Sequence, residues 1–154
     1  MAANTNTLRP FEMTPAMRRG TRMLVALLKL GVPMGPLRLL AHRGRKTGTV
    51  YRTPVALVVD GDEMWLVAAF GEVNWVHNVR AAGEVRFKQG WRGKTYRIEE
   101  LSHAAAAPVL RTFRRRFGLV PFIRPYFDAT GSSSDAAFRR EAERHPVFRL
   151  SPKV

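Results

Sequence analysis

The residues most suited to chemistry in this sequence lie in one short basic segment, residues 42–52, which reads HRGRKTGTVYR. It contains four cations, Arg43, Arg45, Lys46 and Arg52, and one titratable ring, His42. Its two glycines would let the backbone approach a ligand, and a guanidinium can bind a phosphate or carboxylate through two hydrogen bonds. The segment therefore predicts an anion site. Because it lacks the GxxxxGK spacing of a phosphate-binding P-loop, a solvated basic turn is the alternative.

A second candidate segment, residues 68–83, reads AAFGEVNWVHNVRAAG. Small residues end an expected strand, and Trp75 follows on an expected short helix, so backbone amides and an aromatic wall could face a flat ligand. In the alternative interpretation, Trp75 and Val79 are only core residues, since they lie four positions apart on the helix. His77 is expected to face solvent.

Composition limits the remaining classes of function. The 154 residues suffice for one domain, and the formal net charge of +14 would attract nucleic acid, anionic lipid or a polyanionic small molecule. The chain has no cysteine, which excludes disulfides and thiolate chemistry. The four histidines show no ligand-like spacing, so we predict no metal site.

The N-terminal part of the chain predicts a loose tail over residues 1–12, followed by a helix over about 14–30 that belongs to a domain spanning 13–154. Thr14 is the expected helix cap, with proline at the first helical position. The helix is amphipathic and basic, so it either packs on the core or lies on anionic lipid. Its apolar run is too short to span a bilayer. We expect a cytoplasmic protein, with contact to the inner membrane face left open.

The rest of the chain predicts short strands and helices. Strands are expected over residues 37–43, 49–59, 63–70, 84–90, 94–101 and 145–150. Helices are expected over 74–83, with Asn74 as its cap, over 102–118 and over 132–144. Turn signals between successive strands predict hairpins, and alternating β and α units are absent. The fold class is therefore α+β, an antiparallel barrel with flanking helices.

Three separated motifs resemble those of one family. The motif GRKTG with a following arginine and proline, the motif VAAFG with NWVHNVRAAG, and a closing HPVFRL occur in the order found in the deazaflavin (factor 420)-dependent nitroreductases and quinone reductases. The resemblance covers residues 37–150 and implies a split antiparallel β-barrel related to the flavin reductases. It assigns the phosphate and acidic tail of the deazaflavin to a set of residues that consists of Arg45, Lys46, Thr47, Gly48, Arg52 and Pro54.

The resemblance also implies residues around the deazaflavin ring. The ring-lining set consists of Ala68, Ala69, Phe70 and Gly71, with Trp75 and Asn78 on the helix that follows. Ala69 stands where many family members have serine, which removes a hydroxyl that could bind ring or substrate. Tyr126 is the candidate to orient the acceptor or donate a proton; in the alternative interpretation it packs beside Phe122 and Phe127.

The resemblance implies hydride transfer from the reduced deazaflavin to a quinone, a nitroaromatic or a similar lipophilic acceptor. The apolar face of the N-terminal helix suggests separately that such an acceptor could be recruited from a membrane. A split barrel that binds FMN, haem or a fatty acid without catalysis is the alternative, because a fold does not determine its ligand. A nucleic-acid-binding module, suggested by the arginines within 111–116, is disfavoured because the aromatic residues are expected to be buried. The oligomeric state stays open.

Overall fold

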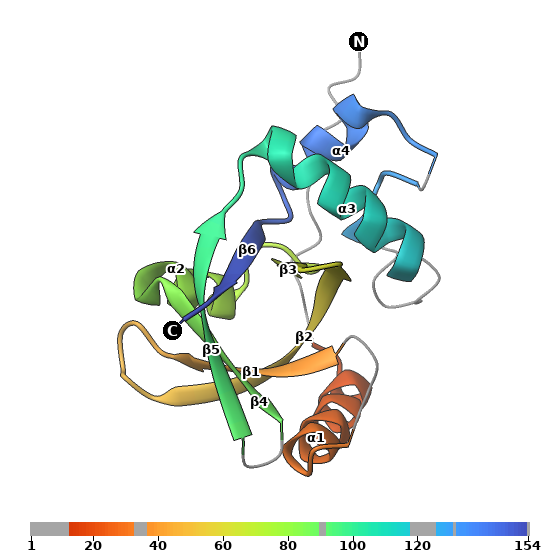
Figure 1. The fold of residues 1–154 in the computed structure, drawn as a ribbon. Coiled ribbons are helices and arrows are strands. Elements are labelled where there is room, and N and C mark those ends of the chain that lie inside the picture. Colours follow the sequence, from red (N-terminus) through yellow and green to blue (C-terminus); the bar gives the residue numbers. More distant parts are fainter. Residues whose placement is uncertain (1–12, 33–36, 90–91, 118–125, 131, 154) are drawn as a thin grey trace.

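The computed structural model describes residues 13–32, 37–89, 92–117, 126–130 and 132–153. These residues form six strands and four helices, which together build a barrel with helices at both of its ends and on one side (Figure 1). The predicted N-terminal tail lies outside the described residues. Among the described residues, no helix combines the length and apolar character needed to cross a membrane.

The strands form a closed antiparallel barrel in the order β1-β2-β3-β6-β5-β4. Their bounds are β1 (Leu37–Arg43), β2 (Val50–Asp60), β3 (Glu63–Val67), β4 (Glu84–Gln89), β5 (Arg92–Glu100) and β6 (Val147–Pro152). Sequential strands pair as hairpins, and the C-terminal β6 closes the barrel between β3 and β5. The expected α+β fold with an antiparallel barrel is confirmed.

Two strands differ from the expected bounds, one being shorter and the other shifted toward the C-terminus. β3 ends at Val67 rather than at residue 70, because the chain turns away immediately afterward and the Gly71 amide bonds back to the Ala68 carbonyl at 3.1 Å. β6 begins at Val147 rather than at residue 145. Here the Pro146 carbonyl accepts a hydrogen bond from the Ala68 amide at 2.9 Å, which joins the end of β3 to the start of β6.

The helices are α1 (Pro15–Lys29), α2 (Asn74–Ala82), α3 (His103–Phe117) and α4 (Asp135–Ala142). The predicted cap of α1 is confirmed, because the Thr14 hydroxyl accepts from the Met17 amide at 3.2 Å. The predicted cap of α2 is wrong: Asn74 is already helical, and Val73 is the cap, without a side-chain hydrogen bond. The Asn74 side chain is thereby left to line a cavity described below.

Two clusters of apolar side chains stabilise the barrel and its helices. The first fills the barrel and includes Leu40, Leu57, Leu66, Trp75, Val79 and Phe148. The second lies between the barrel and the packed pair α3 and α4, and includes Val58, Leu110, Phe113, Phe127 and Phe138. The helix α1 lies at the opposite end of the barrel from α3 and α4 (Figure 1). The barrel is thus covered at both ends, and its side next to α2 carries the site.

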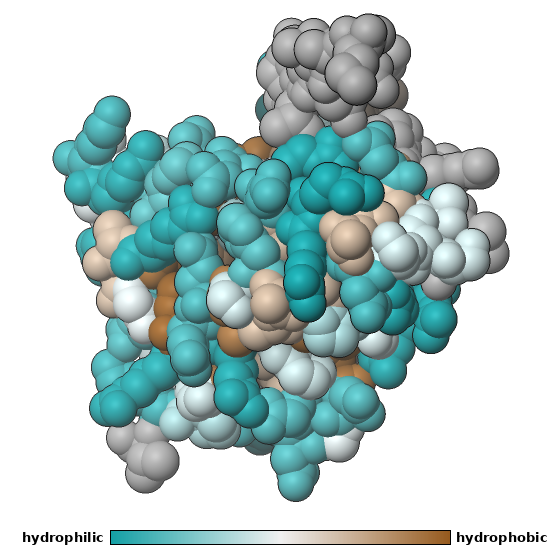
Figure 2. Space-filling view, turned by 90° about the horizontal axis from the view of Figure 1, so that it is seen from above, coloured by the Kyte–Doolittle hydropathy of each residue, from teal (hydrophilic) through white to brown (hydrophobic). Residues whose placement is uncertain are grey.

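The outer surface is mainly hydrophilic in the view from above, where apolar side chains show chiefly in gaps between polar ones (Figure 2). The helix α1 departs from this pattern. Only its Leu28 is buried, whereas Met23 is 65% exposed and Leu30, at its C-terminal cap, is 78% exposed. The helix therefore packs on the barrel through Leu28, while Met23 and Leu30 remain on the surface.

Candidate functional site

A cavity of about 840 Å³ lies between the β1–β2 connection and the N-terminal half of α2. It is lined by His42, Gly44, Arg45, Lys46, Thr47, Tyr51, Arg52, Thr53, Glu72, Val73, Asn74, Trp75, His77 and Asn78. A cavity of this size matches those that hold small molecules and cofactors in other proteins. The two segments that the sequence singled out for chemistry therefore meet at one site.

The β1–β2 connection is braced by its own hydrogen bonds. The Gly44 amide donates to the Thr49 carbonyl at 2.7 Å, and the Gly48 amide donates to the Gly44 carbonyl at 2.9 Å. Gly48 has a φ of 72°, a conformation that glycine adopts without steric cost. A Cβ on Gly44 would lie 2.8 Å from the Thr47 hydroxyl oxygen. Both glycines are thus required for the shape of the loop that presents the cations.

Asn78 connects α2 to this loop through buried hydrogen bonds. Its Oδ1 accepts from the Arg45 backbone amide at 3.2 Å and from the Arg45 guanidinium at 3.0 Å. Its Nδ2 lies 3.0 Å from Nδ1 of His42, and Nε2 of His42 lies 3.0 Å from the Thr53 hydroxyl. A four-residue chain of contacts therefore runs from the cation at the cavity wall to the strand β2.

The sequence left open whether His42 is charged, and in the structure it adds no charge to the basic loop at neutral pH. Its side chain is buried, and this burial lowers the pKa of the imidazole below its ordinary value because the charged form loses its hydration. The ring also stacks on Tyr51, with 5.7 Å between ring centroids. His42 is therefore part of the scaffold of the site.

The cavity is strongly cationic at one wall. Arg45, Lys46 and Arg52 line it, and the only acidic side chain in the described lining is Glu72. The Glu72 carboxylate is already bound by Arg80 at 2.8 Å, and this hydrogen bond lowers the pKa of the carboxyl group. An incoming anion would therefore meet three cations without a free carboxylate to oppose it.

The structure brings part of the predicted site together and separates the rest. Of the predicted residues, Arg45, Lys46, Thr47, Arg52, Trp75 and Asn78 line the cavity. Gly48, Pro54, Ala68, Ala69, Phe70, Gly71 and Tyr126 are not part of this lining. Gly48 shapes the loop, and Pro54 pairs with Leu39 within the barrel. Four of the predicted tail-binding residues therefore share one cavity with Trp75 and Asn78, which were predicted to lie around the ring, whereas residues 68–71 and Tyr126 belong to a different region.

That neighbouring region is built around Ala68. Ala68 is fully buried, and its carbonyl faces Nδ1 of His145 at 3.1 Å. Phe70 meets Tyr126 edge-to-face, with 5.1 Å between ring centroids. A Cβ on Gly71 would lie 3.2 Å from the Arg144 carbonyl, and its φ is 86°, so only glycine fits without strain. These residues are fixed by packing against α4 and the segment 126–130.

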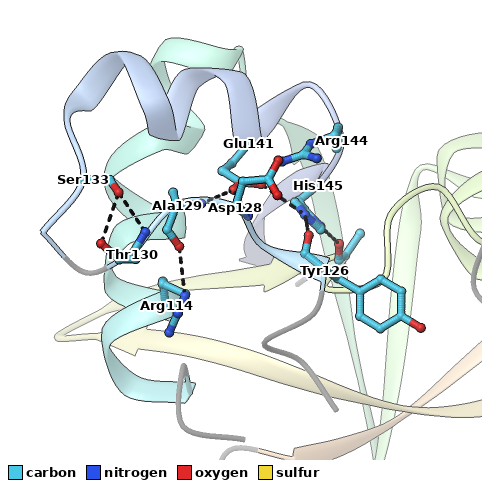
Figure 3. A network of polar contacts seen from close by, with 10 residues as sticks. Arg114, Tyr126, Asp128, Ala129, Thr130, Ser133, Glu141, Arg144 and His145 are labelled. Carbon is cyan, nitrogen blue, oxygen red and sulfur yellow. Dashed lines mark hydrogen bonds and ion pairs between the residues drawn. The ribbon is translucent and has the colours of Figure 1, made fainter. Parts of the chain in front are cut away.

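A buried polar network holds the segment 126–130 in place (Figure 3). Nε2 of His145 faces the Tyr126 carbonyl at 2.8 Å, and the Glu141 carboxylate accepts from the backbone amides of Asp128 and Ala129. The Tyr126 ring projects away from the network in Figure 3. The alternative partner Phe122 lies outside the described residues, whereas Phe127 stacks on His145.

Several residues of the cavity are not among the cofactor-binding residues that the resemblance assigned, although some of them belong to the basic segment 42–52. These are His42, Gly44, Tyr51, Thr53, Glu72, Val73, Asn74 and His77. His77, for which the sequence left a proton donor near the ring as the alternative to a solvent-facing side chain, is half-buried and lines the cavity. The helical spacing of Asn74, His77 and Asn78 could have revealed their shared face, because residues three and four apart lie on one side of a helix.

The arginines of α3 are engaged within the protein. Arg111 binds the Asp135 carboxylate and the Ser133 carbonyl, Arg114 donates to the Ala129 carbonyl, and Arg116 donates to a carbonyl of β2. These contacts, with the burial of Trp75 and most described phenylalanines, argue against a nucleic-acid surface of exposed cations and stacking rings. Within the described residues, no three acidic or histidine side chains are grouped so as to hold a metal ion.

The barrel is similar to solved split-barrel proteins. One is a proposed pyridoxamine 5′-phosphate oxidase from Listeria innocua, with 10% identity, 86% of this chain and 93% of that chain covered, and a TM-score of 0.51. Another is described as a domain-swapped dimer, with 17% identity, coverage of 88% and 96%, and a TM-score of 0.54. At such identities the likeness shows the fold alone, which is the split β-barrel class.

Residues 16–117 match the family described as F420H(2)-dependent quinone reductase. The chain belongs to this family, which confirms the resemblance, the deazaflavin cofactor and the reductase class: it is a reductase that uses reduced deazaflavin (F420H2) to reduce quinones or similar acceptors. A solved F420-H2 dependent reductase, FDR-A, is also similar, with 21% identity, coverage of 75% and 94%, and a TM-score of 0.45. No curated protein matches the chain closely enough to serve as a relative.

Proposed function

We propose that the cavity between the β1–β2 connection and α2 binds the anionic portion of F420H2. The observation that carries this proposal is the convergence of Arg45, Lys46 and Arg52 on one cavity in which the only described carboxylate is already paired. Arg45 is held there by Asn78, so little side-chain entropy remains to be lost on binding. The site is therefore prepared for an anion before the cofactor arrives.

The residues of the cavity fit the chemistry of this cofactor. Its phosphodiester suits a guanidinium, which can donate two parallel hydrogen bonds, and its oligoglutamate tail suits further cations along the wall. Val73 and Trp75 provide apolar surface at the end of the cavity next to α2. FMN, with a single phosphate, would engage fewer of the three cations.

The reduced deazaflavin, when bound, supplies the hydride that a quinone, nitroaromatic or similar lipophilic acceptor takes up. The chain's own part in the reaction is to bind, orient and desolvate, and no nucleophilic side chain is needed. Tyr126 is proposed to orient the acceptor or to donate a proton from its phenol hydroxyl, and Phe70 packs edge-to-face against its ring. The segment between Ala68 and Gly71 is proposed to approach the ring of the cofactor with backbone groups.

The cofactor proposal is tested by following the fluorescence of oxidised F420, and separately of FMN, during titration with the purified protein. The double variant Arg45→Ala/Lys46→Ala should weaken F420 binding by about 100-fold, because charge-assisted hydrogen bonds contribute about 1.5–3 kcal/mol each. The matched control is Arg18→Ala/Arg19→Ala, which removes the same charge from exposed positions of α1. Equal weakening by both double variants would show that only net charge matters, and would overturn the site.

We further propose that α1 contacts an anionic membrane from which a lipophilic acceptor is taken. Met23 and Leu30 expose apolar surface on a segment that also exposes Arg18, Arg19 and Arg22, and this combination is typical of interfacial helices. The proposed location is therefore cytoplasmic, at the inner face of the membrane. This contact is independent of the cofactor cavity, which lies beside α2.

Sedimentation with anionic vesicles tests the membrane proposal. Met23→Asp should reduce vesicle association by about tenfold, because a charge replaces buried apolar contact on the lipid. Ala16→Asp, which adds the same charge at an exposed position of the same helix, is the control. Unchanged association of Met23→Asp, or an equal loss in both variants, would count against a membrane-facing side of α1.

A further inference from the structure

We infer that His42 is a positioning residue, which as a neutral ring orients the Asn78 amide and through it holds Arg45 at the cavity. The three residues come from β1, α2 and the loop between β1 and β2, and their side chains touch in series. The inference rests on the proposed function, because the anionic tail of the cofactor is the ligand that Arg45 would bind. It deepens that function by naming the residue that makes the site sensitive to pH.

The orientation of the Asn78 amide follows from its partners. Both hydrogen bonds from Arg45 come from N–H groups, which can only donate, so the Asn78 atom that faces them must be the carbonyl oxygen Oδ1. The atom that faces His42 is therefore Nδ2, which carries only donors. Nδ1 of His42 must accept, which requires a lone pair there and leaves the ring proton on Nε2, facing the Thr53 hydroxyl.

A proton on Nδ1 of His42 would disrupt this series. Two donors would then face each other at the 3.0 Å that separates Nδ1 of His42 from Nδ2 of Asn78. If the Asn78 amide turned over to offer its oxygen to the ring, its NH2 group would face the donors of Arg45 instead. Protonated His42 and the present position of Arg45 are therefore mutually exclusive. The burial that lowers the pKa of His42 favours the neutral ring.

The charged and titratable groups around His42 come from every element that packs on it. β1 contributes Arg43, the β1–β2 connection contributes Arg45, and Arg86 of β4 pairs opposite the neighbouring Ala41. β2 contributes the stacked Tyr51 and Arg52, and the far side of the cavity contributes His77 and Glu72. Burial of the ring among these groups is what lowers its pKa and favours the neutral state.

The direction of the pH effect separates this inference from simple electrostatics. If His42 acted only as one more positive charge in a basic cavity, its protonation would strengthen anion binding as the pH falls. If it positions Arg45, protonation releases the Asn78 amide and weakens binding. The two interpretations therefore predict opposite slopes of affinity against pH.

Nitrogen NMR of the histidine rings of the cofactor-free protein tests the first part. The wild type should show His42 with an unprotonated Nδ1 and a protonated Nε2, assigned through loss of the signal in His42→Asn. In Asn78→Asp a carboxylate replaces the donor, so both ring nitrogens should be protonated and the ring should titrate at higher pH. The exposed His103, replaced in His103→Gln, gives a control that leaves the His42 signals unchanged. A protonated Nδ1 in the wild type would overturn the inference.

Affinity for oxidised F420 tests the second part. The wild type should bind a few-fold more weakly at pH about 5.5 than at pH about 8. The full loss of about tenfold, expected when one hydrogen bond involving a charged group is lost, is not reached because the lowered pKa of His42 leaves part of the rings neutral at pH about 5.5. His42→Asn places a non-titrating acceptor where Nδ1 stood, so its affinity should follow only the titration of the ligand, which is common to both proteins. The same pH slope in both proteins, or tighter wild-type binding at low pH, would overturn the inference. If neither protein binds F420, the proposed function fails, and the NMR result alone decides the role of His42.

Discussion

The two described histidines that are buried in this protein are surrounded by partners of opposite kind. His42, at the cavity, faces the amide nitrogen of Asn78, which can only donate, so one ring nitrogen must be unprotonated. His145, between the barrel and α4, faces the carbonyl oxygens of Ala68 and Tyr126, which can only accept. Both contacts of His145 are hydrogen bonds only when each ring nitrogen carries a proton.

The surroundings of the two histidines also differ in charge. Glu141, which is 1% exposed, lies 3.4 Å from Nε2 of His145 and 2.7 Å from the Arg144 guanidinium, so a buried carboxylate lies beside both side chains. Around His42 the charged neighbours that line the cavity are mainly cations, and the ring is neutral. The network of Glu141 therefore stabilises the fold, whereas the network of His42 leaves positive charge available to a ligand.

Removing the charge of Glu141 should have the largest effect on stability. Glu141→Gln keeps the shape but removes the buried carboxylate beside His145 and one of the two carboxylates that bind Arg144, the other being Asp128 at 2.9 Å. We therefore expect the free energy of unfolding to fall by about 3 kcal/mol. Urea unfolding measures it. Glu143→Gln, at an exposed position of the same turn, should stay within about 0.5 kcal/mol of the wild type. An equally small effect of Glu141→Gln would remove the contrast between the two regions.

The arginines of the two regions should differ in what they support. Arg114 donates to the Ala129 carbonyl at 3.0 Å, so Arg114→Ala should lower the free energy of unfolding by about 1–2 kcal/mol without weakening F420 binding. Arg45→Ala should do the reverse, with a loss of binding that exceeds its effect on unfolding. Arg139→Ala, at an exposed position of α4, is the control for charge. If Arg114→Ala weakened F420 binding as much as Arg45→Ala does, the two regions would form a single site.

The smallest expected effect is the pH dependence of stability, which should differ between the two regions. Burial alone would raise the pKa of Glu141, but hydrogen bonds from His145 and Ala129 and the charge of Arg144 outweigh it, so the pKa is lowered. The unfolded chain then takes up the proton first, and the contribution of Glu141 is present above its ordinary pKa of 4.5 and lost as the pH falls through the folded value.

His42 should act in a higher pH window. Burial lowers its pKa in the folded protein. Above the ordinary pKa of 6.5 the ring is neutral in both the folded and the unfolded state, so it adds no pH dependence. As the pH falls below 6.5 the unfolded chain is protonated first, and the free energy of unfolding declines. Urea unfolding between pH about 8 and about 4 measures both windows. His42→Asn should remove the upper decline and Glu141→Gln the lower one. A decline that either variant leaves in place must be assigned to another group.

Much of the fold followed from local patterns. Strands that alternate between polar and apolar residues, separated by a turn at Asp60–Asp62, predicted the first hairpins because each strand presents one face to the barrel. Thr14 caps the start of α1 as expected, because its side chain supplies an acceptor. Gly83 caps the end of α2 as expected, because it adopts a φ of 71°. The sequence predicts neither strand nor helix over residues 119–128, and of these the structure describes only 126–128.

The site could be predicted only in part, because residues that contact one another there lie far apart in the sequence. The basic loop was recognisable because its cations and glycines are consecutive. The partners of Arg45 and His42 on α2 are more than thirty positions away, with His42 and Asn78 separated by 36 positions. No local pattern specifies that Asn78 turns its oxygen to one residue and its nitrogen to the other. Sequence reasoning therefore found the cations but missed the contacts that hold them.

The sequence by itself determined the family, the strands and helices, and the basic loop, because each depends on residues close together in the chain. The tertiary structure decided that β6 closes the barrel between β3 and β5, that Ala68 is buried against His145, and that His77 faces a cavity. It also decided that the two buried histidines face partners of opposite kind, an amide nitrogen at His42 and two carbonyl oxygens at His145. A ring's protons follow from the donors and acceptors around it, and for both histidines these are supplied by segments far apart in the sequence.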